Sequence, residues 1–421
     1  MTSGNMVRRS TRLAILATGL LSTLLPSPAP GLSAPEESQP RVHGEPIAIP
    51  NSRFTPSDRG STAIESWSFE QRERELAFLT DEQRQKAQAF FAIPEDGQGV
   101  LLRTTSDFAR ADLLSTSIKL DPFRWIDVTV EYAVETGDPA LFVCLRPTDD
   151  PSLVDLEFLP KTEPGKRNSA IVRLHSGLHG GDYSISISVV GNGVGRILSV
   201  EAANAGEYVR PTKPVFVVDL LHRQPTKELG WKDAERLVKV FGFPSIEFAH
   251  CTQVTREILE SADPALIILS PVGKDGPTPQ NTDMDRLNES VRTAVRHGAP
   301  VVGICAGHQV LAWLNPTARG GEGREWGPTR IEIIKDDPLF GGMPRAPVLV
   351  LSESHNAIVE DGFRGRAETI ASTDICKTQI FRYRGRPWYS FQAHIERGWE
   401  DSCPEAYLLW KNMLRDWKLV E

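Results

Sequence analysis

The sequence predicts an all-β domain followed by an α/β domain with a parallel sheet, and three observations support this prediction. The chain has 421 residues, of which 40% are hydrophobic, which is enough for more than one packed domain. From residue 100 to about residue 203, apolar residues alternate with polar ones, as they do in strands. From Pro214 onward, continuous apolar runs alternate with amphipathic helical segments, an order typical of strand–helix units in a parallel sheet.

Charge and composition exclude several classes of function. The net charge is −8, from 55 acidic and 47 basic residues, so the chain is a poor electrostatic match to nucleic acid or to anionic lipid. No apolar run reaches the roughly 18–20 residues of a membrane-spanning helix. The 5 cysteines are too few for a disulfide scaffold, and their odd number leaves at least one thiol unpaired within the chain.

Residues 1–34 have the pattern of an export signal. Arg8, Arg9 and Arg12 precede the apolar run Leu13–Leu25, and this stretch contains no acidic residue. A short basic region followed by a short apolar core is typical of a cleaved signal peptide. We therefore expect an exported protein, periplasmic or extracellular, that has no membrane span once the signal is removed. An uncleaved anchor and a mis-assigned start codon are the alternatives.

Residues 35–65 are rich in proline, serine and charge, which predicts a linker. Residues 66–208 are expected to form a β-sandwich or jelly roll, preceded by a helix within 66–92, where Glu, Gln and Arg are frequent. The segments WIDVTVEYAV and DYSISISVV alternate apolar and polar residues, as half-buried antiparallel strands do. By pattern alone this part resembles carbohydrate-binding sandwiches, so a glycan is one candidate ligand. The strands are expected near 98–103, 113–118, 126–134, 140–146, 169–175, 184–190 and 196–201.

Residues 214–421 are expected to form the α/β domain. Runs such as VFVVDLL and ALIILS are apolar throughout, which suits parallel strands buried on both faces. Between the runs, KDAERLVKVFG and MDRLNESVRTAVRHG carry apolar residues at helical spacing. The expected strands start at Val215, Ser245, Ala265 and Ala299, and the expected helices start at Lys232, Thr255, Met284 and Ala306.

The segment GICAGHQ is the strongest chemical signal in the chain. Cys305 lies between a predicted strand and a predicted helix, with Gly303 and Gly307 two positions to either side. This is the pattern of a nucleophile elbow with Cys in place of Ser, whose sharp turn favours residues without a Cβ atom. At a helix N-terminus the thiolate is favoured over a thiol whose ordinary pKa is about 8.5. The N–H of Ala306 would point to a developing oxyanion. A buried structural cysteine is the alternative.

A thiolate nucleophile needs a base and a group that orients the base. In RPWYSFQAHIE, a strand is expected over 388–393, His394 follows at its carboxyl end, and Glu396 stands two residues further. Ligands of parallel sheets bind at the carboxyl ends of strands, so Cys305 and His394 are expected to meet there. On an extended chain, His394 and Glu396 would face the same side. A buried structural histidine is the alternative.

GICAGHQ together with FQAHIE resembles class I glutamine amidotransferase domains of the triad type, whose usual forms are G-[IV]-C-x-G-[HM]-Q and Q-F-H-P-E. LIILSPVGKDGP, KDDPLFGGMP and LSESHNAIV resemble three further segments of this family, in the same order along the chain. The resemblance covers about residues 214–420. It implies a flavodoxin-like α/β fold and hydrolysis of a γ-carboxamide.

The resemblance also implies roles for single residues. Cys305 would attack the amide carbon of glutamine, His394 would pass a proton to the departing ammonia, and Glu396 would fix the tautomer of His394. Ser354 and Asn356 would alternatively be turn residues that satisfy their own backbone. The substrate's amino-acid end would be held by Gln309, Ser354, His355 and Asn356, and the oxyanion by the backbone at Val272, Gly273 and Ala306.

Three departures from the family pattern bear on function. Val272 stands where a glycine normally allows close approach, Ile395 replaces a proline, and a signal peptide is unusual for domains that normally feed a cytoplasmic synthase. We expect no metal or cofactor. No nucleotide-binding motif is visible, so the ammonia would go to a separate synthase or be released. A γ-glutamyl peptide hydrolase and a non-catalytic scaffold that retains the fold are the other functions considered.

Overall fold

The computed structural model describes residues 44–54, 64–71, 81–178, 180–220, 230–272, 282–344, 346–360, 363, 365–397 and 403–421. The expected signal peptide, most of the expected linker and Gly273 lie outside the described residues. All the described residues belong to one unit, Pro40–Glu421. Within them, none of the helices combines the length and the apolar content needed to cross a bilayer.

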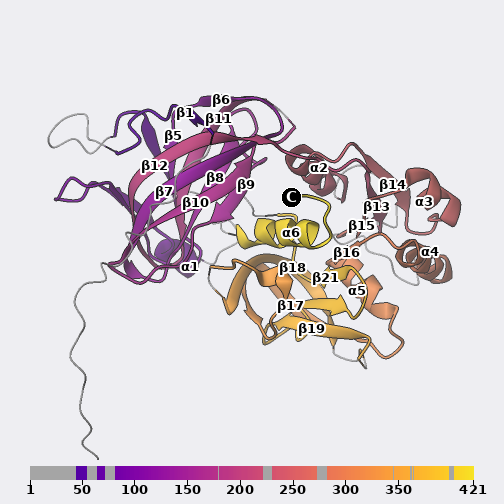
Figure 1. Cartoon of the computed structure of the whole chain (residues 1–421). Coiled ribbons are helices and arrows are strands. Elements are labelled where there is room, and N and C mark those ends of the chain that lie inside the picture. The colour runs from indigo at the N-terminus through magenta and orange to yellow at the C-terminus, as the bar shows by residue number, and fades with distance from the viewer. Residues whose placement is uncertain are drawn as a thin grey trace, which may run out of the picture. The chain divides into compact units, whose positions relative to one another are not determined.

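The N-terminal half contains two antiparallel sheets, drawn in indigo and magenta in Figure 1. In the first sheet the strand order is β10-β7-β12-β4-β3, with β1 paired to β12; in the second it is β2-β5-β11-β8-β9, with β6 paired to β11. The strands are β1 (Glu45–Ile47), β2 (Trp67–Gln71), β3 (Ala89–Ala92), β4 (Val100–Thr104), β5 (Arg110–Ser115), β6 (Ile118–Leu120), β7 (Arg124–Gly137), β8 (Ala140–Pro147), β9 (Asp155–Phe158), β10 (Arg167–His175), β11 (Gly181–Val190) and β12 (Gly193–Glu207).

Alternate residues of the two sheets share one apolar core. Val128 and Val130 of β7 are buried in the same cluster as Ile185 and Ile187 of β11. Two-residue spacing places such side chains on one face of a strand, which is why the alternating pattern located these strands in the sequence. The expected strands overlap β4, β5, β7, β8, β10, β11 and β12, whereas β1, β2, β3 and β9 were not expected.

The helix expected within 66–92 can be compared only in part, because residues 72–80 lie outside the described residues. In the described part of this stretch, α1 is a six-residue helix, Asp81–Lys86, and it lies between β2 and β3. Phe69 of β2 and Phe91 of β3 pack against the shared core with their ring centroids 5.9 Å apart. Phe69 and Phe91 therefore lie on strands of two different sheets, within a stretch where a helix was expected.

The described strands of the C-terminal half form one sheet in the order β14-β13-β15-β16-β21-β20-β19-β17-β18. Strands β14, β13, β15, β16 and β21 run parallel, and the remaining pairs are antiparallel. The strands are β13 (Val215–Asp219), β14 (Ile246–His250), β15 (Leu266–Leu269), β16 (Val301–Ile304), β17 (Arg319–Ile333), β18 (Val348–Glu360), β19 (Ala367–Ser372), β20 (Ile380–Tyr383) and β21 (Trp388–Phe391).

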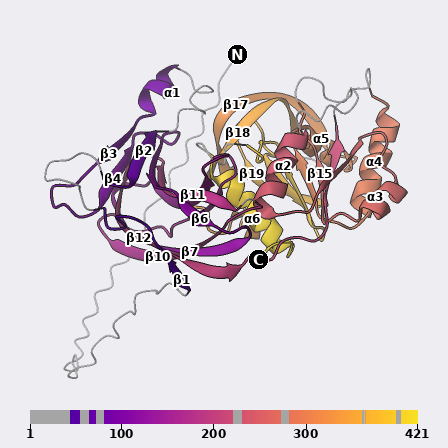
Figure 2. The same ribbon diagram turned by 90° about the horizontal axis from the view of Figure 1, so that it is seen from above.

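Helices cover both faces of this sheet, as the continuous apolar strands predicted. Val215 and Val217 of β13 lie in one apolar cluster with α2 and α6, whereas Phe216 and Val218 lie in another with α3, α4 and α5. Figure 2 shows the two groups of helices on opposite sides of β15. The helices are α2 (Gly230–Phe241), α3 (Arg256–Ala262), α4 (Met284–Arg296), α5 (Ala306–Trp313), the 3-10 turn η2 (Pro338–Phe340) and α6 (Glu405–Asp416).

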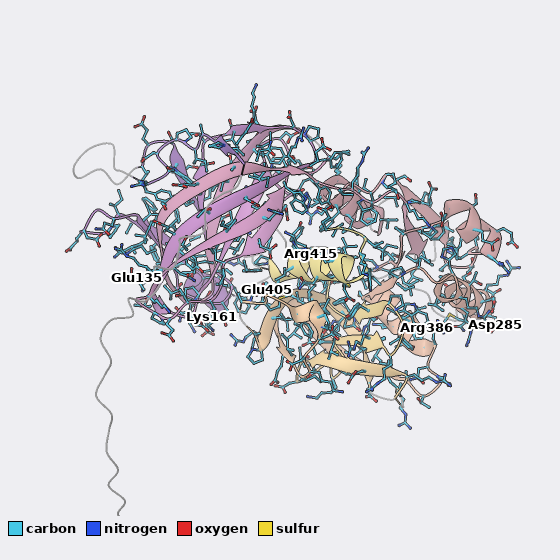
Figure 3. The ribbon with its side chains drawn as sticks, in the orientation of Figure 1. Glu135, Lys161, Asp285, Arg386, Glu405 and Arg415 are labelled. Carbon is cyan, nitrogen blue, oxygen red and sulfur yellow. The ribbon has the colours of Figure 1, made fainter. Side chains whose placement is uncertain are left out.

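Helix α6 also makes buried polar contacts with the N-terminal half. The carboxylate of Asp155 on β9 accepts hydrogen bonds from the Tyr407 hydroxyl at 2.5 Å and from Lys411 Nζ at 3.1 Å. Both partners are on α6, whose ends are marked by the labels of Glu405 and Arg415 in Figure 3. All three side chains are buried, so breaking this group would leave uncompensated charge in the interior.

Candidate active site

Cys305 occupies a sharp turn between β16 and α5. Its backbone angles are φ 52° and ψ −104°, a combination that residues with a Cβ atom adopt only at an energetic cost. A Cβ atom added at Gly303 would lie 2.7 Å from the Gly307 carbonyl oxygen, and one at Gly307 would lie 2.1 Å from the Leu269 oxygen. Real Cβ atoms do not approach so closely, so this turn requires both glycines.

The thiol of Cys305 faces the end of β21. Ile304 pairs with Phe391 in the parallel ladder, and the Cys305 N–H donates to the Phe391 carbonyl at 2.8 Å. The next residue, Gln392, places its Nε2 atom 3.9 Å from Cys305 Sγ. Sequence reasoning did not single out Gln392, although it stands two positions before His394 in the motif.

His394 and Glu396 form a close buried pair. His394 Nδ1 and Glu396 Oε1 are 2.6 Å apart, and both side chains are almost entirely excluded from solvent. Strand β21 ends at Phe391, so a turn makes this contact, and the chain from His394 to Glu396 is not extended as the sequence predicted. Trp410 of α6 supports the turn by donating from Nε1 to the Ile395 carbonyl at 3.1 Å.

The two members of this pair shift each other's pKa in opposite directions. Burial lowers the pKa of His394, but Glu396 and the adjacent Cys305 outweigh burial and raise it to about 10. Burial raises the pKa of Glu396, but the charge and hydrogen bond of His394 dominate and lower it. His394 is therefore an imidazolium at neutral pH. Its Nε2 has no hydrogen bond of good geometry among the described residues, yet Cys305 is near enough to affect its pKa.

His308, which follows Gly307, is a neutral buried histidine. Its Nδ1 lies 3.0 Å from the Ser390 hydroxyl, and its ring packs against Phe381 with centroids 4.7 Å apart. Burial lowers the pKa of His308 to about 3, so it does not carry a proton near neutral pH. The imidazolium beside Cys305 is accordingly His394.

Gln309 and the segment Ser354–Asn356 lie close together. Gln309 Nε2 donates to the Ala357 carbonyl at 3.0 Å, which ties α5 to β18. Ser354 and Asn356 are within β18 and not in a turn, and the strand directs them to the face opposite His355. Ser354 is half-buried and Asn356 is exposed, whereas His355 is buried. The three residues are thus not presented together on one face.

His355 lies between two buried glutamates. Its Nδ1 is 3.0 Å from Glu353 Oε2, and its Nε2 is 3.3 Å from Glu325 Oε2. Burial lowers the pKa of His355, but the two carboxylates raise it to about 9. Within the described ranges, this group also has the spacing to hold a metal ion, with ligand atoms within 4.8 Å of one another. Because each ring nitrogen of His355 already faces a carboxylate, protonated His355 can balance the charge of the two glutamates without a metal ion.

The predicted oxyanion residues are only partly described. Ala306 is the first residue of α5, directly after Cys305, and Val272 follows β15, the strand next to β16. Both residues are buried in the apolar cluster on the α5 face of the sheet. Gly273 lies outside the described residues. The described backbone thus has Ala306 and Val272 near the carboxyl ends of neighbouring parallel strands.

The fold and the site define an α/β protein in which a cysteine and a His–Glu pair occupy the carboxyl ends of two neighbouring parallel strands. Over part of its length, the chain is homologous to glutamine-hydrolysing GMP synthase subunits. It is 34% identical to the subunit of Archaeoglobus fulgidus over 102 residues, which cover 23% of this chain and 52% of that protein. The corresponding subunit of Pyrococcus abyssi is 29% identical over 142 residues, covering 33% of this chain and 70% of that protein.

The comparison with solved structures gives a weaker likeness. A glutamine amidotransferase from Thermotoga maritima superposes with a TM-score of 0.36 and 20% identity, covering 49% of this chain and 86% of that one. No protein-family model matches the chain. The chain spans only 52% and 60% of the first two curated relatives it matches.

Proposed function

We propose that this protein is an exported cysteine amidohydrolase of the class I glutamine amidotransferase type, which releases ammonia from glutamine or from a γ-glutamyl compound. The observation that carries the proposal is the position of Cys305 on a strained strand–helix turn, next to the buried His394–Glu396 pair. The curated relatives support it, because glutamine hydrolysis is part of their names.

In the proposed reaction, Cys305 acts as a thiolate nucleophile and His394 as the proton donor. The Cys305 thiolate attacks the carbon of the γ-carboxamide, and the negative oxygen is stabilised by backbone N–H groups at Ala306 and at Val272. His394 gives its Nε2 proton to the nitrogen, the carbon–nitrogen bond breaks, and ammonia leaves a γ-glutamyl thioester. Neutral His394 then takes a proton from water, the hydroxide attacks the thioester, and glutamate departs. The thiolate and the imidazolium are restored.

The finer features of the fold belong to the same proposal. We infer a flavodoxin-like arrangement for residues 214–421, supported by the parallel strands with helices on both faces, and a β-sandwich for 66–208, supported by two sheets around one core. Export rests on the basic and apolar pattern of residues 1–34. Gln309, Ser354 and Asn356 remain the proposed substrate residues, whereas His355 lies on the opposite face of β18, between Glu325 and Glu353, and is no longer proposed to contact the substrate.

The proposal also covers the destination of the ammonia and the ligand of the N-terminal half. Because the relatives are named as subunits of GMP synthase, a separate ammonia-accepting protein is one destination, and free release is the other. A glycan is the proposed ligand of the N-terminal half. A glycan array probed with the full chain tests it, and an absence of any bound glycan would contradict it.

The main experiment measures ammonia release by the purified full chain across a panel of glutamine, γ-glutamyl amides and γ-glutamyl peptides. We expect turnover of at least one panel member and loss of that turnover in Cys305→Ala. A parallel reaction with a diazo-ketone analogue of glutamine should add mass to the peptide that contains Cys305. If a folded protein neither turns over the panel nor takes the label, the scaffold alternative replaces the proposal.

A further inference from the structure

Gln392 is a buried polar residue that touches the reactive sulfur. Its side chain is completely excluded from solvent, at the carboxyl end of β21 and next to the turn that carries Cys305. The Nε2 atom lies 3.9 Å from Cys305 Sγ, within the range of hydrogen bonds to sulfur. The proposed reaction gives this side chain no task, although a buried amide needs a partner for each of its polar atoms.

The direction of the Gln392 amide is fixed by its neighbours. A backbone carbonyl only accepts hydrogen bonds, so the Gln309 atom that lies 3.0 Å from the Ala357 oxygen must be the amide nitrogen. The same nitrogen lies 3.4 Å from Gln392 Oε1, and this contact supports the orientation in which the Gln392 oxygen faces Gln309. In this orientation the Gln392 NH₂ group faces Cys305.

We propose that Gln392 is a catalytic residue that donates an N–H to the Cys305 thiolate, and that Gln309 is a positioning residue that holds the Gln392 amide in this direction. The proposal rests on the proposed function, because it assigns these residues to the reaction of the same sulfur.

The hydrogen-bonding chemistry of the Gln392 amide explains how this side chain would assist the reaction of Cys305. An NH₂ group can donate but cannot accept, so it stabilises the thiolate, a strong acceptor, more than the S–H form, whose sulfur accepts only weakly. The same donor helps the second half of the reaction, because the sulfur departs as a thiolate when water breaks the thioester. His394 moves the protons, while Gln392 keeps the sulfur charged without changing its own protonation. Gln309 uses both amide hydrogens in this task, which leaves its oxygen to accept from a substrate ammonium group.

The experiment follows the pH dependence of alkylation of Cys305 by iodoacetamide, read from the mass of the Cys305 peptide in the full chain. Gln392→Met removes the donor at similar size, and Gln392→Glu places a negative charge in the same space. The matched control is Gln379→Met, because Gln379 is an equally buried glutamine whose amide donates to Glu325 at 2.6 Å rather than to the sulfur. Circular dichroism checks the fold of each variant.

We expect the alkylation midpoint to rise by about one pH unit in Gln392→Met, which is a roughly tenfold slower reaction below the midpoint, and by more in Gln392→Glu. Gln309→Leu should raise the alkylation midpoint by less, because the Gln392 NH₂ group is kept but no longer held in one orientation by Gln309. The control should match the wild type. If the alkylation midpoint is unchanged in the folded Gln392 variants, the proposal is overturned. If Gln392→Met does not fold, the midpoints of Gln392→Glu and Gln309→Leu test the proposal in its place.

Alkylation does not require turnover, so the two proposals can fail separately. If the substrate panel gives no ammonia while the midpoint shifts as expected, the donor assignment stands and the reaction is wrong. If ammonia is released and the midpoint does not shift, the proposed function stands and Gln392 has no part in it.

Discussion

The strained backbone at Cys305 predicts that a glycine at this position gives a more stable protein than an alanine. Cys305 has φ 52° and ψ −104°, which glycine adopts at little cost and alanine does not. Cys305→Ala and Cys305→Gly both remove the sulfur and its contacts, so these losses cancel when the two variants are compared. Both variants should be inactive, and only their stability should differ.

The expected difference in unfolding free energy between Cys305→Gly and Cys305→Ala follows from two opposing contributions. A residue held in such a sparsely populated region costs on the order of 1–3 kcal/mol, which glycine does not incur. Replacing alanine by glycine at an unstrained position costs roughly 0.5–1 kcal/mol, because the unfolded chain gains freedom. The first term is larger, so Cys305→Gly should be more stable than Cys305→Ala by about 1 kcal/mol, or about 2 °C in Tm.

The assay is urea and thermal unfolding of both variants, followed by tryptophan fluorescence and circular dichroism. Ala306→Gly is the control, since Ala306 begins α5 with ordinary helical geometry and should be destabilised by about 0.5–1 kcal/mol. The reasoning is refuted if Cys305→Gly unfolds at the same point as Cys305→Ala, or earlier, in the manner of the control.

Three further predictions concern the buried pairs. Glu396→Gln should retain roughly 10- to 100-fold more turnover than His394→Ala in steady-state kinetics, because it misorients the base but does not remove it; equal losses would contradict this. The folded pKa of His394, about 10, exceeds its ordinary 6.5, so its stabilisation is complete below pH 6.5 and is lost as pH rises toward 10. The stability difference between wild type and His394→Gln should therefore shrink over this range, and a constant difference would refute the pairing. Asp155→Asn should cost about 3 kcal/mol in urea unfolding, whereas Asp138→Asn, at an exposed pair with Lys161, should cost under about 1 kcal/mol; equal costs would show that burial does not set the difference.

Local patterns in the sequence located most strands and the chemical core of the site. Alternation with period two found β7 and β11, and continuous apolar runs found β13 and β15, because burial on one or two faces leaves a direct pattern in the chain. The glycines around Cys305 indicated the turn, since only residues without a Cβ atom fit there. The roles of Cys305, His394 and Glu396 remain predictions that the kinetic experiments test.

Contacts between distant segments could not be predicted from the sequence, because they depend on strand register and on how helices pack across a sheet. The register of β16 against β21 sets Gln392 beside Cys305, and the pairing of β17 with β18 puts Glu325 next to His355. The strands β2 and β3 also depend on tertiary packing, because they belong to different sheets and their Phe69 and Phe91 pack against the core that the two sheets share. The sequence by itself indicated which residues are candidates for the reaction. Only the tertiary structure decided which donors surround them, since a hydrogen bond requires an orientation that the order of residues does not contain.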